Sequence, residues 1–168
     1  MNNLNNDVMT SASVRPWIQR DAEAERVQDG AKSAIVLLAD ATHTDGKATV
    51  NRALLQEGSP GAPAHRHLAT TEMIFVISGS LDVLVDDRVQ VLGAGDLVVL
   101  PPGTTHAFAP THGCEADMLA IFTPGQDRFE YYRLLERLHR GTATLEELTS
   151  TSHLYDNHYA ESSAWQTH

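Results

Sequence analysis

The sequence is poor in cysteine, in basic residues and in long apolar runs, and each shortage excludes a class of protein. Its 168 residues include one cysteine, Cys114, which excludes an internal disulfide and argues against a zinc finger. Twelve Lys and Arg against 22 Asp and Glu give a formal net charge of −10, which disfavours binding to a phosphate backbone. No stretch approaches the roughly 18 apolar residues of a membrane span. We therefore expect neither nucleic acid nor a membrane as a partner.

The amino-terminal segment is polar. Residues 1–13, MNNLNNDVMTSAS, have neither the basic start nor the apolar centre of a secretory signal, and we interpret them as a disordered leader. Together with the single cysteine, this favours a cytoplasmic protein. The length and the 42% of hydrophobic residues predict one globular domain.

Short apolar and β-branched runs predict an all-β core. Residues 14–57 contain SAIVLLAD and ATVNRALLQ, two expected strands separated by the turn-prone THTDGK. Residues 58–124 continue with TEMIFVIS, SLDVLVDD, VQVLG, DLVVLPP, THAFAP and ADMLAIFTP, bounded by Gly, Asp and Pro. This regular spacing predicts an antiparallel sandwich or barrel over 14–124.

The pattern changes to helical spacing in a carboxy-terminal extension and tail, residues 125–168. The apolar residues with this spacing are Phe129, Tyr132, Leu135 and Leu138. Asp127 is the expected N-cap and Gly141 the expected stop. A second short helix is expected where Thr144 and Glu147 fit a capping box. The Tyr and Trp residues of the tail suggest packing against the barrel or a neighbouring chain.

The segment HRHLATTEMIFVISG contains the most informative polar residues. His65 and His67 are two residues apart, and in a strand they would share a face at about 6.5–7 Å. Glu72 begins the next apolar run and could reach the same cavity from an adjacent strand. His106 follows a Pro-Pro-Gly turn, at the expected start of another strand. These four are the candidate metal ligands, and the alternative is that they are ordinary polar residues.

Three imidazoles and one carboxylate form a mixed nitrogen and oxygen donor set. It suits one divalent ion of Fe, Mn, Ni, Co, Cu or Zn per chain better than Ca or Mg, which prefer oxygen ligands alone. An ion with five or six ligands would keep room for water, dioxygen or substrate. The set therefore indicates a catalytic site and not a closed structural one.

The segment from about 58 to 110 resembles the two sequence motifs of the single-domain cupin family. The intervals of the first motif are reproduced by His65, His67, Glu72 and Gly79. Those of the second are reproduced by Gly95, Pro101, Gly103 and His106. Ser59 and Pro110 replace a usual Gly and Asn, and neither position is a metal ligand. The resemblance implies an all-β double-stranded β-helix, the cupin jelly-roll barrel, with the metal in one mouth and with homodimer formation.

Three functions are compatible with the resemblance. The first is a 2-oxoglutarate-independent dioxygenase, similar to flavonol (quercetin) dioxygenases, acting on a small aromatic or polyketide-like substrate. Glu72 would then be both ligand and catalytic proton acceptor. The second is a zinc-dependent cyclase, isomerase or decarboxylase without redox chemistry. The third is a module that binds or senses a small molecule without turnover.

Other residues have weaker functional signals. Met73, Phe75 and Ile77 are expected in the core or in a dimer contact. The helical aromatics Phe129, Tyr131 and Tyr132 are expected to pack against the barrel, with a lid over the pocket as the alternative. Solvated or hydrogen-bonded roles are expected for His43, His112, His139, His153, His158 and His168.

Overall fold

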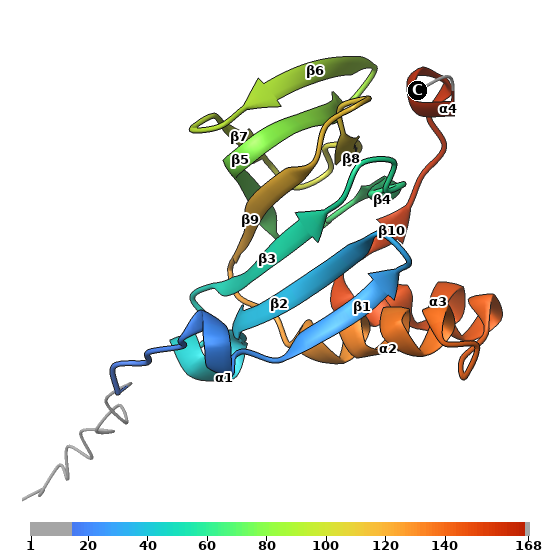
Figure 1. Ribbon diagram of the computed structural model, residues 1–168. Helices are drawn as coiled ribbons and strands as arrows, with labels where there is room; N and C mark the ends of the chain where they lie inside the picture. The colour runs from blue at the N-terminus through green and yellow to red at the C-terminus, as the bar shows by residue number, and fades with distance from the viewer. Residues whose placement is uncertain (1–14, 167–168) are drawn as a thin grey trace, which may run out of the picture.

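The computed structural model describes residues 15–166, so the leader predicted for residues 1–13 lies outside the described part. Within that part, ten strands form a curled sheet and two helices cover one side (Figure 1). The predicted all-β jelly-roll with short carboxy-terminal helices is confirmed. No helix among these residues is long and apolar enough to cross a membrane.

The strands are β1 (Arg26–Gly30), β2 (Ser33–Ala39), β3 (Thr49–Leu55), β4 (Ala62–Arg66), β5 (Thr71–Val85), β6 (Arg88–Gly93), β7 (Leu97–Leu100), β8 (His106–Pro110), β9 (Ala116–Thr123) and β10 (His158–Tyr159). The helical segments are η1 (Asp21–Glu23), α1 (Ala41–Thr44), α2 (Phe129–His139), α3 (Leu145–Thr151), η2 (Ser152–Tyr155) and α4 (Ser163–Gln166).

The long strand β5 joins the two sheets of the barrel. Its first half lies between β9 and β7, and the order on the β9 side is β1-β2-β3-β9-β5. Its second half lies between β6 and β8, and β8 continues through β4 to β10. Side chains in the first half alternate, so that Glu72, Ile74 and Val76 are buried. One strand thus places a carboxylate on the inner face directly beside apolar core residues.

The core lies between the two sheets. Ile74, Val76, Leu81 and Met118 have no exposed surface at all. Burying a side chain of this kind contributes about 1.5–3 kcal/mol, so this cluster gives the barrel a rigid interior. The metal-ligand candidates at its margin are therefore attached to a well-packed frame.

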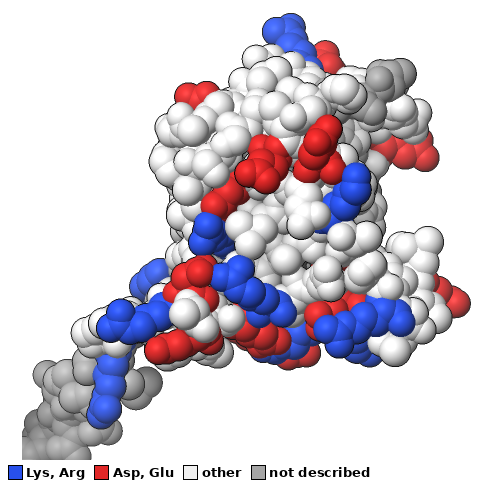
Figure 2. All heavy atoms as spheres, viewed as in Figure 1, with Lys and Arg blue, Asp and Glu red and all other residues white. Residues whose placement is uncertain are grey.

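The helices of the extension cover the β1–β2 side of the barrel (Figure 1). Tyr131, Tyr132 and Leu148 share an apolar cluster with Val27 and Ile35. On the face seen in Figure 2, acidic and basic side chains are interspersed over this region. Two ion pairs involve residues of α2, Arg133–Glu25 at 2.6 Å and Arg137–Glu147 at 2.8 Å.

The start of α2 differs from the prediction. Asp127 is not its cap; Arg128 precedes the first helical residue and has no capping side chain of its own. The carboxylate of Asp40 accepts hydrogen bonds from the main-chain N–H of Arg128 and Phe129, at 3.0 and 3.4 Å. A group 88 residues away thus takes the place of a local cap. The predicted stop at Gly141, with φ of 70°, is confirmed.

The tail returns to the barrel. β10 pairs with β4, with Tyr159 opposite His65, and the Trp165 ring lies against a cluster that includes Leu84 and Ala107. The boundary between barrel and extension at residue 124 stays a prediction. β10 of the extension pairs with β4 of the barrel, so the two parts share one sheet.

Candidate metal centre

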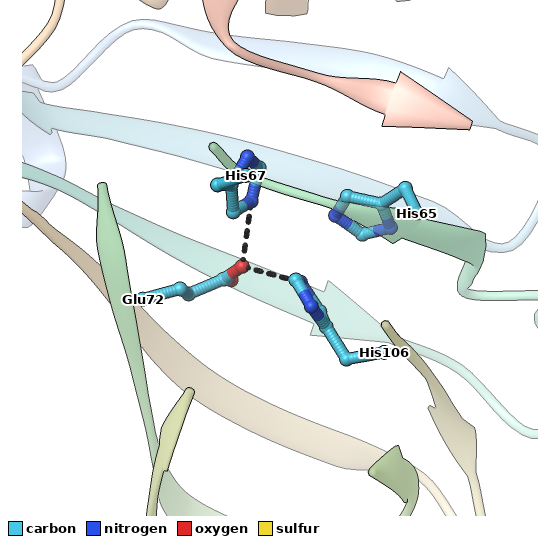
Figure 3. Close-up of side chains that lie close together, drawn as sticks. All are labelled: His65, His67, Glu72 and His106. Carbon is cyan, nitrogen blue, oxygen red and sulfur yellow. Dashed lines mark hydrogen bonds and ion pairs between the residues drawn. The ribbon is translucent and has the colours of Figure 1, made fainter. Parts of the chain in front are cut away.

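Three strands bring the four predicted ligands together. His65 lies on β4 and His67 one residue beyond its end, while Glu72 lies near the start of β5 and His106 begins β8. All four side chains are buried and point toward a common centre (Figure 3). One ligand atom of each lies within 4.8 Å of the other three. The structure therefore contains a group that could hold a metal ion.

The carboxylate is the centre of the group. Its Oε2 lies 3.0 Å from Nε2 of His67 and 2.8 Å from Nε2 of His106 (Figure 3). The rings of His65 and His106 are 4.2 Å apart between centroids. Four atoms with lone pairs thus converge in a buried space, an arrangement that requires a proton or a metal cation.

The main chain sets the orientation of each imidazole. Nδ1 lies 2.8 Å from the Pro63 carbonyl in His65 and 3.0 Å from the Thr104 carbonyl in His106. In His67 it lies 2.5 Å from the carbonyl of Asp156. A carbonyl oxygen can only accept, so Nδ1 donates in each ring and Nε2 is left to bind an ion. The donor set and its orientation fit a transition metal.

Burial and mutual contact shift the pKa values of the group. Burial and the neighbouring imidazoles of His106 and His67 lower the pKa of His65 to about 3, so its ring is neutral at neutral pH. Burial works against the Glu72 charge, but hydrogen bonds from His106 and His67 hold the pKa of this carboxyl well below its usual range. Burial likewise works against a charge on His106, yet contact with Glu72 raises the pKa of that imidazole. An ionised carboxylate and neutral imidazoles are the forms that bind metals.

The tail holds the loop between His67 and Glu72. The carboxylate of Asp156 accepts the main-chain N–H groups of Leu68, Ala69 and Thr70 at 2.8 to 3.0 Å, and the Thr70 hydroxyl at 2.8 Å. Its carbonyl is the acceptor for His67 already described. Asp156 therefore positions both the ligand and the loop that follows it.

A cavity of about 240 Å³ adjoins the cluster. His65 and Phe108 contribute its barrel side, and Tyr131 and Tyr132 contribute its helix side. The predicted packing of these aromatics against the barrel is thus observed, and the same rings line a space next to His65. Whether α2 moves as a lid stays a prediction.

Sequence patterns did not indicate Arg128 and Asn157, which line this cavity, or Asp156, which holds the loop after His67. They lie in the extension and tail, which have no motif that links them to the barrel. Their one signal was polar residues among the aromatics of the tail. Of the histidines expected outside the site, His43 accepts a hydrogen bond from the Asp40 main chain at 3.0 Å, and His168 lies outside the described residues.

Comparison with known proteins agrees with the fold. The family model described as "Cupin domain" matches residues 51–122. Quercetin 2,3-dioxygenase from Bacillus subtilis (strain 168) is 32% identical over 97 residues, a match that spans 55% of this chain and 27% of that protein.

Two solved structures share the fold. KdgF from Halomonas sp. is 16% identical with a TM-score of 0.60, covering 67% of this chain and 97% of that one. The polyketide cyclase RemF from Streptomyces resistomycificus is 15% identical with a TM-score of 0.56, covering 77% and 100%. At these identities the likeness concerns the fold alone.

Proposed function

The chain carries a cupin domain, and from this premise we propose that it is a metal-dependent enzyme, a 2-oxoglutarate-independent dioxygenase acting on a small aromatic or polyketide-like molecule. The observation that most directly supports this proposal is the convergence of three imidazole side chains and one carboxylate beside a cavity lined by aromatic rings. The similarity to a quercetin dioxygenase adds support, although this chain spans about a quarter of that protein's length.

In this proposal His65, His67, Glu72 and His106 hold one divalent transition metal ion, of Fe, Mn, Ni, Co, Cu or Zn. The three Nδ1 hydrogen bonds to carbonyl groups support it, because they leave Nε2 as the nitrogen of each ring that an ion can bind. The chemistry that such an ion supplies is Lewis acidity toward a substrate oxygen and, if it is redox-active, activation of dioxygen.

Glu72 has a second role in the proposal, as the acceptor of a substrate proton. The carboxylate oxygen that His67 and His106 contact is the one basic oxygen of the cluster, so it is the group placed to take a proton from a bound substrate. Its Oε2 lies at the centre of the cluster, and His65 of the same cluster lines the cavity. Tyr131 and Tyr132 on the helix side limit the access of bulk water.

The proposal also covers the oligomeric state and the cellular location of the enzyme. A homodimer and a cytoplasmic location are proposed, the first from the apolar side chains on the outer face of β5 and β7, the second from the single cysteine.

Anaerobic purification, metal analysis and dioxygen-uptake assays with an aromatic and polyketide panel test this function. We expect about one redox-active metal per chain and substrate-dependent uptake. Glu72→Gln should abolish uptake, whereas Glu57→Gln, at an exposed site, should leave it unchanged. Zinc with turnover but no uptake would instead indicate a Lewis-acid cyclase, isomerase or decarboxylase. Tight binding without product would indicate a binding module.

A further inference from the structure

Arg128 is a buried cation with an unusual set of partners. Only 2% of its surface is exposed. Its guanidinium lies over the Phe122 ring, 4.2 Å from the centroid, and donates to the Tyr155 carbonyl at 2.7 Å. Among residues 15–166 no carboxylate forms an ion pair with it. Its direct contacts are neutral, and the charge of Glu72 acts on it without a hydrogen bond or ion pair. A buried charge held in this way is costly, which suggests that a ligand supplies a negative charge in direct contact.

This guanidinium lies close to the metal-binding group. Phe122 is opposite Glu72 in the pairing of β5 with β9, and its ring meets the His67 ring edge-on at 5.3 Å between centroids. Arg128 and His65 line the same cavity. A molecule in that cavity can therefore touch the guanidinium and His65 of the metal cluster at once.

Two further polar groups of the cavity have no protein partner. Nδ2 of Asn157 and Oδ1 of Asp29 are buried and form no hydrogen bond. Both residues line the cavity, and Asn157 is only 3% exposed. An unsatisfied buried group is rare in folded proteins because it loses its water without a replacement. A bound molecule with oxygen atoms would satisfy the amide N–H.

The volume of the cavity limits the size of the molecule that it can bind. About 240 Å³ corresponds to roughly eight water molecules at liquid density. Drug-sized ligands usually occupy about 300–1,000 Å³. A single ring with one or two small substituents fits this space better than a three-ring flavonol.

We infer that the cavity binds a small single-ring organic acid, with its carboxylate held by Arg128 and a second oxygen directed toward the histidine cluster. The inference rests on the proposed function for the role of that second oxygen. A divalent ion and Arg128 together exceed the charges of Glu72 and Asp29, so the occupied site favours an anion over a neutral molecule. Arg128 acts here as a specificity residue contributed by the extension, outside the cupin motifs.

Calorimetric titration of the zinc-loaded protein with salicylate and with its neutral analogue salicylamide tests this inference. Zinc is chosen because it has no redox chemistry that would consume the probe. We expect salicylate to bind at least tenfold more tightly than salicylamide. In Arg128→Gln this preference should fall at least fivefold. In Arg88→Gln, whose side chain is 81% exposed, it should be unchanged.

Two results of these titrations would contradict the binding of an organic acid through Arg128. Equal binding of the two probes by the wild-type protein, or no binding of either, would overturn it whether or not the variant folds. A preference that persists in folded Arg128→Gln would assign selection to the metal alone and would also overturn it.

Metal analysis of the same samples separates the two proposals. A chain that binds no zinc, yet prefers salicylate through Arg128, contradicts the proposed function alone. A chain that binds zinc stoichiometrically without that preference contradicts this inference alone.

Discussion

At the scale of single residues, hydrogen bonds made by Nδ1 of each imidazole ring direct its Nε2 toward the centre of the cluster. His65 and His106 donate Nδ1–H to carbonyl groups two residues earlier in the chain. Each ring therefore needs no partner outside its own turn or strand. Because the carbonyl acceptors are local, loss of one of these rings should leave the other oriented.

His106→Ala is accordingly expected to weaken metal binding by at least about tenfold while the barrel still folds. The wild-type protein should also gain about 2.7 kcal/mol of unfolding free energy when free metal exceeds Kd a hundredfold, and the variant should not. Metal analysis and urea unfolding with and without a chelator measure both effects. His153→Ala, at an exposed position, is the control. Full metal content in His106→Ala would refute the ligand assignment.

Asp29 provides a test of pH dependence. Burial raises the pKa of this carboxyl, although contact with Ser33 partly opposes the rise. Its contribution to stability is therefore present below the unfolded pKa of about 3.9 and is lost as pH rises through the folded pKa. Asp29→Asn should be more stable than the wild type at pH 7, and the difference should vanish near pH 3.

Urea unfolding at a series of pH values measures this difference. Asp87→Asn, in the exposed β5–β6 turn, should show no comparable gain at pH 7. A wild-type protein that equals or exceeds Asp29→Asn in stability at pH 7 would show that the buried carboxylate carries no such cost.

At the scale of elements, the tail completes the metal centre from outside the motifs. The loop from Leu68 to Thr70 has three main-chain N–H groups whose acceptor is Asp156. Asp156 itself has a φ of 54°, just before β10 pairs with β4. A short strand and one residue in a left-handed conformation thus attach the end of the chain to a ligand loop.

Asp156→Ala should leave these donors without their acceptor and cost about 1–3 kcal/mol of unfolding free energy. Metal affinity should fall about 10–100-fold because the His67 acceptor shifts with the loop. Zinc competition titrations and thermal unfolding measure the two effects, with Asp45→Ala as a control that also has a positive φ. Unchanged zinc affinity in Asp156→Ala would show that the tail is not needed for the site.

At the scale of the whole molecule, the outer face of the β5–β7 pair is apolar and partly exposed. Phe75, Ile77, Leu97 and Val99 are between 37% and 55% exposed. Phe75 lies opposite Leu97, and Val99 lies opposite Met73, so they share one face. An apolar face of this kind is a common site of protein association.

We expect the wild-type protein to sediment at twice the 18.3 kDa of the chain. The double variant Leu97→Lys/Val99→Lys should sediment as a monomer, because two charges would have to be buried at the contact. Val91→Lys on β6, 65% exposed, should remain a dimer. A monomeric wild-type protein would exclude the proposed homodimer.

Much of the fold follows from the sequence because strand alternation and turn residues are local. Ile74 and Val76 with Glu72 on one face, the hairpin at Asp86 and the strand beginning at His106 all depend on neighbours within a few residues. The spacing of the four candidate ligands belongs to the same class, since a strand and a turn determine which side chains share a face.

Only the tertiary structure decided what surrounds the cluster. Asp40 caps a helix 88 residues away, and Asp156 holds a loop 86 to 88 residues before it. Arg128 reaches the cavity because α2 packs against β1, a contact that no local pattern specifies. Hydrogen bonds and charges at such separations form only after the chain has folded, so their partners cannot be derived from spacing along the sequence. The sequence by itself therefore determined the candidate ligands, and the tertiary structure determined the walls and charges of the cavity beside them.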